Sequence, residues 1–270
     1  MPPLNLEALT AALDHAADDP DVAAVDSAQD LIYDAWDADG RSDGIVAHRA
    51  LAISPLCADA YTLLAEQPTT SDTDAITLYR LGMKAGELAL GTEFQTLHGE
   101  FWGWLQTRPY MRARAGLADA LYRTGAHDQA LDHWRAMLDL NSNDNQGVRY
   151  SLVLALLRHG GDEEIRDLLD RYDDDVGIVV TYTRTLLAFR DRKPDASDLL
   201  AEAVRSNRHV PAVLTRTKRG KSSTNGLLTM GGVDEATWYV REAGDAWRAT
   251  DGAVGWLVEL AATVPPDPKW

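Results

Sequence analysis

The chain has 270 residues, 45% of them hydrophobic and 25% charged, which is typical of a globular protein and not of a disordered one. Its 42 acidic and 26 basic side chains give a formal net charge of -16, which would repel nucleic-acid phosphates and anionic lipids. No stretch approaches the roughly 18 consecutive apolar residues of a membrane span, and the N-terminus lacks the layout of a signal peptide. The single cysteine, Cys57, excludes an intrachain disulfide and a multi-cysteine zinc site. We therefore expect a cytoplasmic protein with no nucleic-acid or membrane partner, no metal and no cofactor.

The first part of the chain is predicted to form helices separated by turn residues. Residues 1–25 are assigned to an N-terminal helix or cap. Gly40 ends the helix that follows, and Ser54 with Pro55 ends the next one. The polar stretch QPTTSDTD then separates two more helices. The predicted helices cover residues 28–38, 45–53 and 58–66, and a further one carries Ala75 and Tyr79.

Residues 83–110 interrupt the helical pattern. They are predicted to form an extended helix followed by an inserted aromatic segment, FQTLHGEFWGWLQTRPY. Insertions in stacked helical repeats fall on one face, which is often the binding face. We favour the interpretation that the aromatic side chains fill the gap left by an irregular repeat. The alternative is that the insert anchors a partner, through Trp102, Trp104, Arg108 and Tyr110.

The clearest repeat unit spans residues 111–144, a length that matches the tetratricopeptide unit of about 34 residues. Gly125 separates its two predicted helices. Small Ala118 marks the place where a neighbouring helix comes close, and Ala130 and Trp134 share a face of the second helix. The unit departs from the usual pattern at its end, where Ser142 stands in place of proline.

The next segment, residues 145–175, repeats this plan. Gly160 and Gly161 break it 35 residues after Gly125, and Asp162 is predicted to be the N-cap of the second helix. The recurring break predicts that the two segments are equivalent helix pairs.

The last third of the chain is predicted to form a further helix pair and a closing cap. Its first stretch contains VVTYT, so a strand is an open alternative there. A loop rich in Gly, Ser, Thr and Lys precedes the cap, and a break near Asp251 and Gly252 divides the cap's helix. The predicted elements are helices over 179–189 and 196–206, a loop over 216–232, a helical region over 234–260, and a cap over 233–270.

These elements define an all-α fold class. We expect a tetratricopeptide-like right-handed superhelix of antiparallel helix pairs, an α-solenoid, with its repeats in residues 26–215 and the insertion at 83–110. Each pair would be stabilised by burying its apolar face on the next.

Four segments carry a resemblance to a known family. They are LCADAYTLLAE at 56–66, TRPYMRARAGLA at 107–118, LNSNDNQGVRY at 140–150 and NRHVP at 207–211. In these segments the chain resembles bacterial tetratricopeptide-repeat proteins related to the suppressor of tumorigenicity seven family, over about residues 28–215. The resemblance implies a helical-repeat fold and a role in protein interaction, with no active site to transfer.

The first helices of stacked pairs line a concave groove, and several polar side chains are predicted to lie there. One hypothesis is a clamp for a partner's carboxylate, because arginine can hold a carboxylate with two parallel hydrogen bonds. The alternative, which we favour, is structural: Asn145 caps a helix, and the arginines pair with Asp119, Asp144 or Glu100. The candidate partner-binding residues are Arg112, Asn145, Gln146, Arg149, Tyr150 and Tyr182.

Other patterns are weaker. The acidic residues within 37–43 faintly resemble a calcium-binding loop, but the first and last ligand positions of such a loop hold no acidic residue. Residues 220–223 resemble part of a phosphate-binding loop, but the glycine and the preceding strand that this loop requires are missing. Cys57 is expected to be buried and not nucleophilic. The sequence therefore predicts a non-enzymatic adaptor that binds a protein or peptide in the groove. The alternative is an enzyme or small-molecule binder that uses Arg112, His98 and Glu100 in the same groove.

Overall fold

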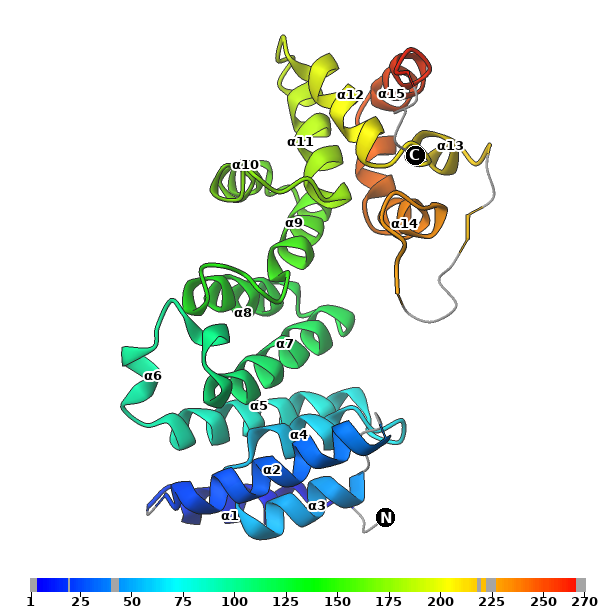
Figure 1. Cartoon of the computed structure of the whole chain (residues 1–270). Helices are drawn as coiled ribbons and strands as arrows, with labels where there is room; N and C mark the ends of the chain where they lie inside the picture. The colour runs from blue at the N-terminus through cyan, green and yellow to red at the C-terminus, as the bar shows by residue number, and fades with distance from the viewer. Residues whose placement is uncertain (1–3, 19, 40–43, 218–219, 222–226, 266–270) are drawn as a thin grey trace. The chain divides into compact units, whose positions relative to one another are not determined.

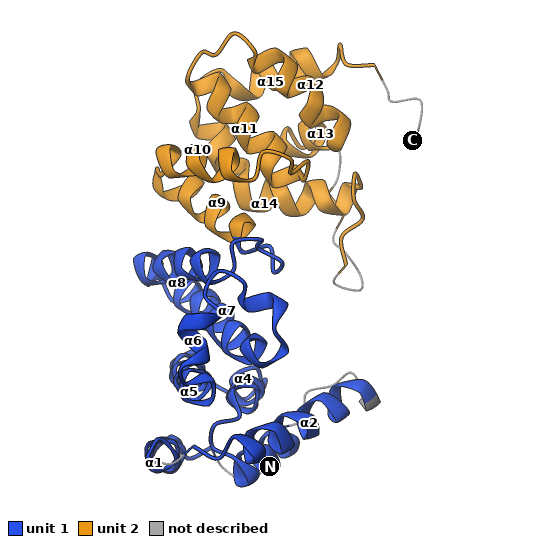
Figure 2. Ribbon diagram, turned by 60° about the vertical axis from the view of Figure 1, so that its left-hand side comes forward, with its two compact units in different colours: residues 1–148 blue, residues 149–270 orange. Residues whose placement is uncertain are grey.

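The structure is a computed structural model, and it describes residues 4–18, 20–39, 44–217, 220–221 and 227–265. In these residues the protein is all-α, and β-structure is limited to two isolated bridges at Asn141. Two compact units form, residues 1–148 (unit 1) and residues 149–270 (unit 2), coloured separately in Figure 2. The boundary falls inside the region 26–215, which the sequence analysis treats as one run of repeats.

The helices of unit 1 pack in chain order. Helix α2 pairs with α3, α4 with α5, and α7 with α8. Figure 1 shows α4 and α5 between the α1–α3 group and the later pair. Helix α2 begins six residues before the predicted start, at Val22 instead of 28, and α4 lies within the predicted range. The bounds are α1 Leu6–Ala16, α2 Val22–Asp39, α3 Gly44–Ile53, α4 Ala58–Ala65, α5 Asp72–Leu90, α7 Arg108–Arg123 and α8 His127–Leu140.

Helices α5 and α7 approach closely because small residues face each other across their interface. A Cβ atom on Gly82 would lie 3.1 Å from the Cβ of Ala113. A Cβ atom on Gly86 would lie 2.8 Å from the Cβ of Tyr110, closer than such atoms approach in proteins. The two glycines are one helical turn apart, so they form one smooth contact strip on α5.

The inserted segment forms short turns: α6 at Glu93–Thr96 and two 3₁₀ turns at Phe101–Gly103 and Leu105–Thr107. The extended helix expected before it is α5, which has 19 residues. Phe94 packs edge-to-face on both Phe101 and Tyr110, with ring centroids 5.0 Å apart in each case. This part of the insert fills space, as the favoured interpretation predicts.

The insert is hydrogen-bonded to the end of α8. The Ser142 amide donates to the Gly99 carbonyl at 3.0 Å, and the Trp102 amide donates to Asn141 Oδ1 at 3.4 Å. A proline at position 142, usual for such repeats, has no amide hydrogen to donate. The departure of the sequence from the repeat pattern therefore has a structural role.

The helices α7 and α8 confirm the helix pair predicted within residues 111–144, although α7 begins at Arg108, inside the predicted insertion. Gly125 adopts φ +88°, a backbone conformation that favours glycine, and it ends the first helix. Ala130 and Trp134 are both buried, and the Trp134 ring lies 5.4 Å from the Tyr122 ring.

Unit 2 contains the remaining helices, and α11 and α12 form a pair. At the start of α9, Asp144 Oδ1 accepts from the Val148 amide at 2.7 Å, whereas Asn145 Oδ1 accepts from Asn141 Nδ2, so the expectation that Asn145 caps this helix is wrong. Asp162 is not an N-cap, because the cap position is Gly161; the Asp162 carboxylate binds Arg190 at 2.7 Å instead. The bounds are α9 Val148–His159, α10 Asp162–Arg171, α11 Ile178–Arg190, α12 Ala196–Ser206, α13 Val210–Leu214, α14 Val233–Ala249 and α15 Ala253–Ala261.

The stretch VVTYT belongs to helix α11, so the strand alternative is wrong. The hydroxyl groups of Thr181 and Thr185 donate to the carbonyls four residues earlier, at 3.1 and 2.8 Å, which satisfies them inside the helix. The division of the last helical region at Gly252, with φ +75°, is confirmed. The short helix α13 was not predicted.

Some predicted features fall outside the described residues. They include Gly40, Asp43, Lys218, Arg219 and Ser222. Within the described part of the chain, no helix combines the length and apolar character that crossing a bilayer demands.

Candidate functional site

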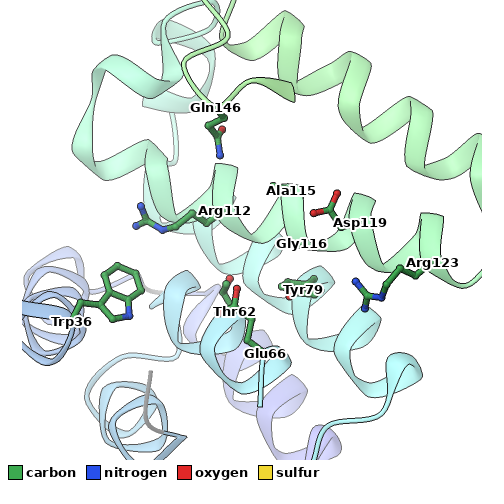
Figure 3. Close-up of a pocket in the computed structure, with 10 residues that line it drawn as sticks. All are labelled: Trp36, Thr62, Glu66, Tyr79, Arg112, Ala115, Gly116, Asp119, Arg123 and Gln146. Atoms are coloured by element: carbon green, nitrogen blue, oxygen red, sulfur yellow. The ribbon is translucent and has the colours of Figure 1, made fainter. Parts of the chain in front are cut away.

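Unit 1 contains a pocket of about 440 Å³, a volume in the range of small-ligand and side-chain sites. Helices α2, α4 and α7, the first members of the three pairs, provide most of its lining (Figure 3). Helix α5 contributes Tyr79, and Gln146 lies just before α9. The lining residues are Trp36, Thr62, Glu66, Tyr79, Arg112, Ala115, Gly116, Asp119, Arg123 and Gln146.

A buried ion pair holds one side of the pocket. Asp59 on α4 is fully buried, and Arg112 donates to both of its carboxylate oxygens, with Nε at 2.7 Å from Oδ1. Gln29 on α2 donates to Oδ2 at 2.7 Å. This pair satisfies a charge that burial would otherwise make costly, and it joins the first helices of three consecutive pairs.

Arg112 also contacts aromatic rings of α2. Its guanidinium carbon lies 5.2 Å from the Trp36 ring centroid and 5.9 Å from that of Tyr33. Burial alone lowers the pKa of Arg112, but the hydrogen bonds and the charge of Asp59 more than reverse this, so its pKa is raised. Arg112 is a permanent cation whose Nε and Nη2 groups are already engaged.

Tyr79 crosses the pocket beside Gly116. A Cβ atom on Gly116 would lie 2.2 Å from a Tyr79 ring carbon, so the ring occupies the space that any larger residue would need. Burial and the negative charge of Glu66 raise the pKa of Tyr79 to about 12, although Arg123 opposes the shift. Tyr79 therefore remains a neutral phenol at physiological pH.

Two carboxylates face the same space. Loss of water and the neighbouring Asp59 raise the pKa of Glu66, while Arg112 lowers it. Loss of water also raises the pKa of Asp119, against the charge of Arg123 and the indole of Trp134. Figure 3 shows Glu66 and Asp119 on opposite sides, from α4 and α7. Both residues are exposed at the protein surface, and partial loss of water around their carboxyl groups disfavours the charged form of each.

Two polar atoms of the lining lack hydrogen-bond partners among the described residues: Thr62 Oγ1 and Gln146 Oε1. Thr62 is only 4% exposed, and its side chain faces the pocket beside Glu66 (Figure 3). A buried hydroxyl without a partner costs about 1–3 kcal/mol, so such groups usually have a function or a bound molecule nearby.

The six candidate partner-binding residues do not share one set of contacts. Arg112 and Gln146 line the pocket of unit 1 together. Asn145 is exposed, and its Oδ1 accepts from Asn141 Nδ2 at 3.3 Å. The other three residues belong to unit 2.

In unit 2, Arg149 and Tyr150 form a local cluster around Asp175. Arg149 Nε and the Tyr150 hydroxyl each donate to Asp175 Oδ2 at 2.7 Å. Burial alone raises the pKa of Asp175, but the Gly177 amide, Tyr150 and Arg149 together hold it below its usual value. The arginines are thus engaged within the chain, as the structural interpretation predicts, Arg112 with Asp59 and Arg149 with Asp175.

Tyr182 cannot offer a flat surface to a partner, because it is fully buried. Its hydroxyl donates to the Asn207 carbonyl at 2.6 Å, and its ring lies 5.5 Å from that of Tyr239. Its position on an apolar helix face gives it a core role instead.

The insert residues divide between interior and surface. Tyr110 is 1% exposed and belongs to the core, whereas Trp104 is 46% exposed. Trp102 is half-buried, with the Arg108 guanidinium 5.3 Å from its ring centroid, and Arg108 Nε donates to the Trp102 carbonyl at 3.0 Å. Of the four candidate contact residues, Trp104 is the most accessible.

His98 and Glu100 do not line the pocket that contains Arg112. His98 Nε2 lies 3.0 Å from Asp139 of α8. Cys57 is fully buried, as expected, and burial raises the pKa of its thiol to about 12. A thiol in this state is a poor nucleophile.

Sequence reasoning missed most of the pocket. Trp36, Thr62 and Glu66 lie on predicted helices, but none stands out in its local sequence. One signal was available, the aspartate Asp59 within the apolar helix α4. A buried aspartate requires a cationic partner, and that partner has to come from elsewhere in the fold.

The fold and the pocket define an all-α protein of helix pairs with a polar site on their first helices. The chain has distant similarity to the suppressor of tumorigenicity 7-like proteins of rat and mouse. In both comparisons it is 26% identical over 238 residues, which cover 78% of this chain and 42% of the relative. The chain thus matches less than half of the length of these proteins. No protein-family model matches the sequence, and no solved structure does.

Proposed function

We propose that the protein is a non-enzymatic interaction module that binds a peptide or protein partner along the first helices of unit 1. The observation that carries this proposal is the pocket itself, which three consecutive first helices line together. Side chains on successive pairs can contact successive residues of an extended chain. The unpartnered Thr62 hydroxyl is a hydrogen-bonding group that a bound chain could satisfy.

The repeat architecture is part of the proposal. The spacing of 35 residues between Gly125 and Gly160 and the sequential pairing of helices support tetratricopeptide-like units in a right-handed superhelix. The distant similarity to suppressor of tumorigenicity 7-like proteins supports a common helical scaffold. Exposed Trp104 is a further contact residue, because tryptophan is enriched at interface hot spots.

The test fills the pocket and measures peptide binding. Ala115 lines the pocket on α7, and Ala136 is similarly half-buried on α8 but does not line it. Peptides selected on the protein from a random dodecapeptide library are measured by fluorescence anisotropy. We expect Ala115→Trp to weaken peptide binding about tenfold or more, because the indole fills the pocket that the peptide would occupy. Ala136→Trp should leave peptide binding nearly unchanged.

Two results would contradict the binding of a peptide in this pocket. If no peptide is selected, while small polar metabolites raise the melting temperature of the wild type and not of Ala115→Trp, the pocket is a small-molecule site. Equal peptide affinity of both tryptophan variants would place binding elsewhere on the chain.

A further inference from the structure

We propose that the pocket of unit 1 accepts a basic side chain, arginine or lysine, of the bound polypeptide, between Glu66 and Asp119. This inference rests on the proposed function, and it specifies the chemistry of the partner. It also reverses the charge that the clamp hypothesis assigned to the partner.

The cations of the pocket are already matched. Arg112 is bound to Asp59 through two hydrogen bonds, and Arg123 Nη2 lies 3.0 Å from Asp72 Oδ1. A partner's carboxylate that took the Nε and Nη2 groups of Arg112 would have to displace Asp59, which is fully buried and would then lose its counter-charge. The arginines therefore disfavour an acidic guest.

The carboxylates of the pocket are not matched to the same degree. Glu66 has no hydrogen bond or salt bridge with any side chain that the structure describes. Asp119 shares Arg123 with the closer partner Asp72. A cation placed between the two acids would meet negative charge from both sides that Arg112 and Arg123 compensate only in part, which is an arrangement that favours binding of a guanidinium or an ammonium group.

The third observation is the buried hydroxyl of Thr62. It is 4% exposed, has no partner among the described residues and lies one helical turn before Glu66 on the same face of α4. Its oxygen is closed to solvent, and a shift of the Thr62 side chain toward the pocket would let it accept an N–H group from a ligand that Glu66 holds. The aromatic rings of Trp36 and Tyr79 add surfaces on which the aliphatic part of a long basic side chain can pack.

The environment of the two acids gives this binding a pH dependence. Their pKa values are raised, mainly by loss of water, so acidification neutralises them earlier than ordinary carboxylates. The other charged groups around them are Asp59, Arg112, Arg123 and the phenol of Tyr79. A bound cation favours the ionised acids, so we expect affinity to fall as the pH is lowered and protons to be released on binding.

The experiment compares four pooled heptapeptide libraries that differ only in their central residue: arginine, lysine, citrulline or glutamate. Citrulline has nearly the shape of arginine without its charge, so it isolates the electrostatic contribution. Affinities are measured by fluorescence anisotropy with the full chain. We expect the arginine and lysine pools to bind about tenfold or more tightly than the citrulline pool, and the glutamate pool to bind most weakly.

Variants of Glu66 and Asp119 test whether these two acids cause the preference for a basic central residue. Glu66→Gln and Asp119→Asn should each reduce the advantage of the arginine pool, and the double variant should abolish it. Glu93→Gln and Asp30→Asn are matched changes at exposed acids outside the pocket, and they should leave the advantage intact. Far-ultraviolet circular dichroism of each variant confirms that the helices remain.

The outcomes separate the two proposals. Equal binding of all four pools overturns the basic-residue pocket and leaves the interaction module standing. A preference for the glutamate pool shows that the arginines select a carboxylate instead. Absence of binding by every pool and by selected peptides overturns the interaction module, and the inference falls with it.

Discussion

Asp59 places a negative charge in the interior of unit 1, where water does not reach it. Arg112 and Gln29 supply the hydrogen bonds that it needs. The Arg112 side chain is itself 24% exposed, so the guanidinium joins the interior to the pocket. Stability and the shape of the site therefore depend on the same residue.

This arrangement predicts a large effect of Arg112→Ala. The variant leaves Asp59 buried without its cation, and we expect the free energy of unfolding to fall by about 3–5 kcal/mol. The matched change Arg123→Ala removes an exposed pair, and it should cost about 1 kcal/mol or less. Urea unfolding measures both values. Equal costs would show that the buried pair has no special role.

Replacing Glu66 is expected to have the opposite effect on stability, and this effect depends on pH. Its pKa is raised in the folded protein above the ordinary value of 4.5, mainly by loss of water. The folded state therefore holds this proton more tightly, and the contribution of Glu66 to stability falls as the pH rises through its folded pKa. We expect Glu66→Gln to be more stable than the wild type at pH 7, and the two to converge below pH 4.5. Urea unfolding between pH 4 and pH 8 tests this, and a variant that is less stable at pH 7 would contradict it.

At the scale of the elements, the end of α8 and the insert stabilise each other through Ser142. Its amide and its hydroxyl both donate to the Gly99 carbonyl, at 3.0 and 3.2 Å. This link holds the insert against the helix pair that follows it.

We predict that Ser142→Pro destabilises the protein although proline is usual there in tetratricopeptide units. The change removes the amide donor, and the expected loss is about 1–3 kcal/mol. Ser142→Ala keeps the amide, so it should cost clearly less. Thermal unfolding of the two variants gives the comparison, and a stabilised proline variant would refute the role assigned to this bond.

The elements were predictable where local sequence determines them. Gly125, Gly160 and Gly252 stand at helix breaks because each adopts a positive φ that other residues disfavour. Helix α11 was ambiguous because its β-branched residues are common in strands, and its packing against α12 decided the outcome. The short helix α13 was not predicted because five residues are too few to show a helical periodicity.

The site was less predictable because its contacts are distant in sequence. The bond between Arg112 and Asp59 joins positions 53 residues apart, and that between Arg149 and Asp175 joins positions 26 apart. Helical periodicity places a residue on a face but does not say which residue of another helix it meets. The sequence therefore indicates which helices line the pocket, but it does not indicate which charged side chains pair with each other.

At the scale of the whole molecule, the chain forms two compact units, and each has a buried polar anchor of its own. Arg112 and Asp59 serve unit 1, and Arg149 and Asp175 serve unit 2. Cooperative unfolding is usually a property of such units.

We predict that calorimetry resolves two unfolding transitions. Arg112→Ala should lower the melting temperature of one transition only, and Asp175→Asn should lower that of the other, because each change weakens one unit. A single transition that both variants shift equally would show that the chain unfolds as one cooperative body.

The contact strip between α5 and α7 has a consequence for how this sequence can vary. A methyl group on Gly86 would overlap Tyr110, and one on Gly82 would press against Ala113. A saturation screen of α5 should therefore show two intolerant positions one helical turn apart, between neighbours such as Lys84 that accept most substitutions. At these two positions the close packing of α5 and α7 depends on the absence of a side chain.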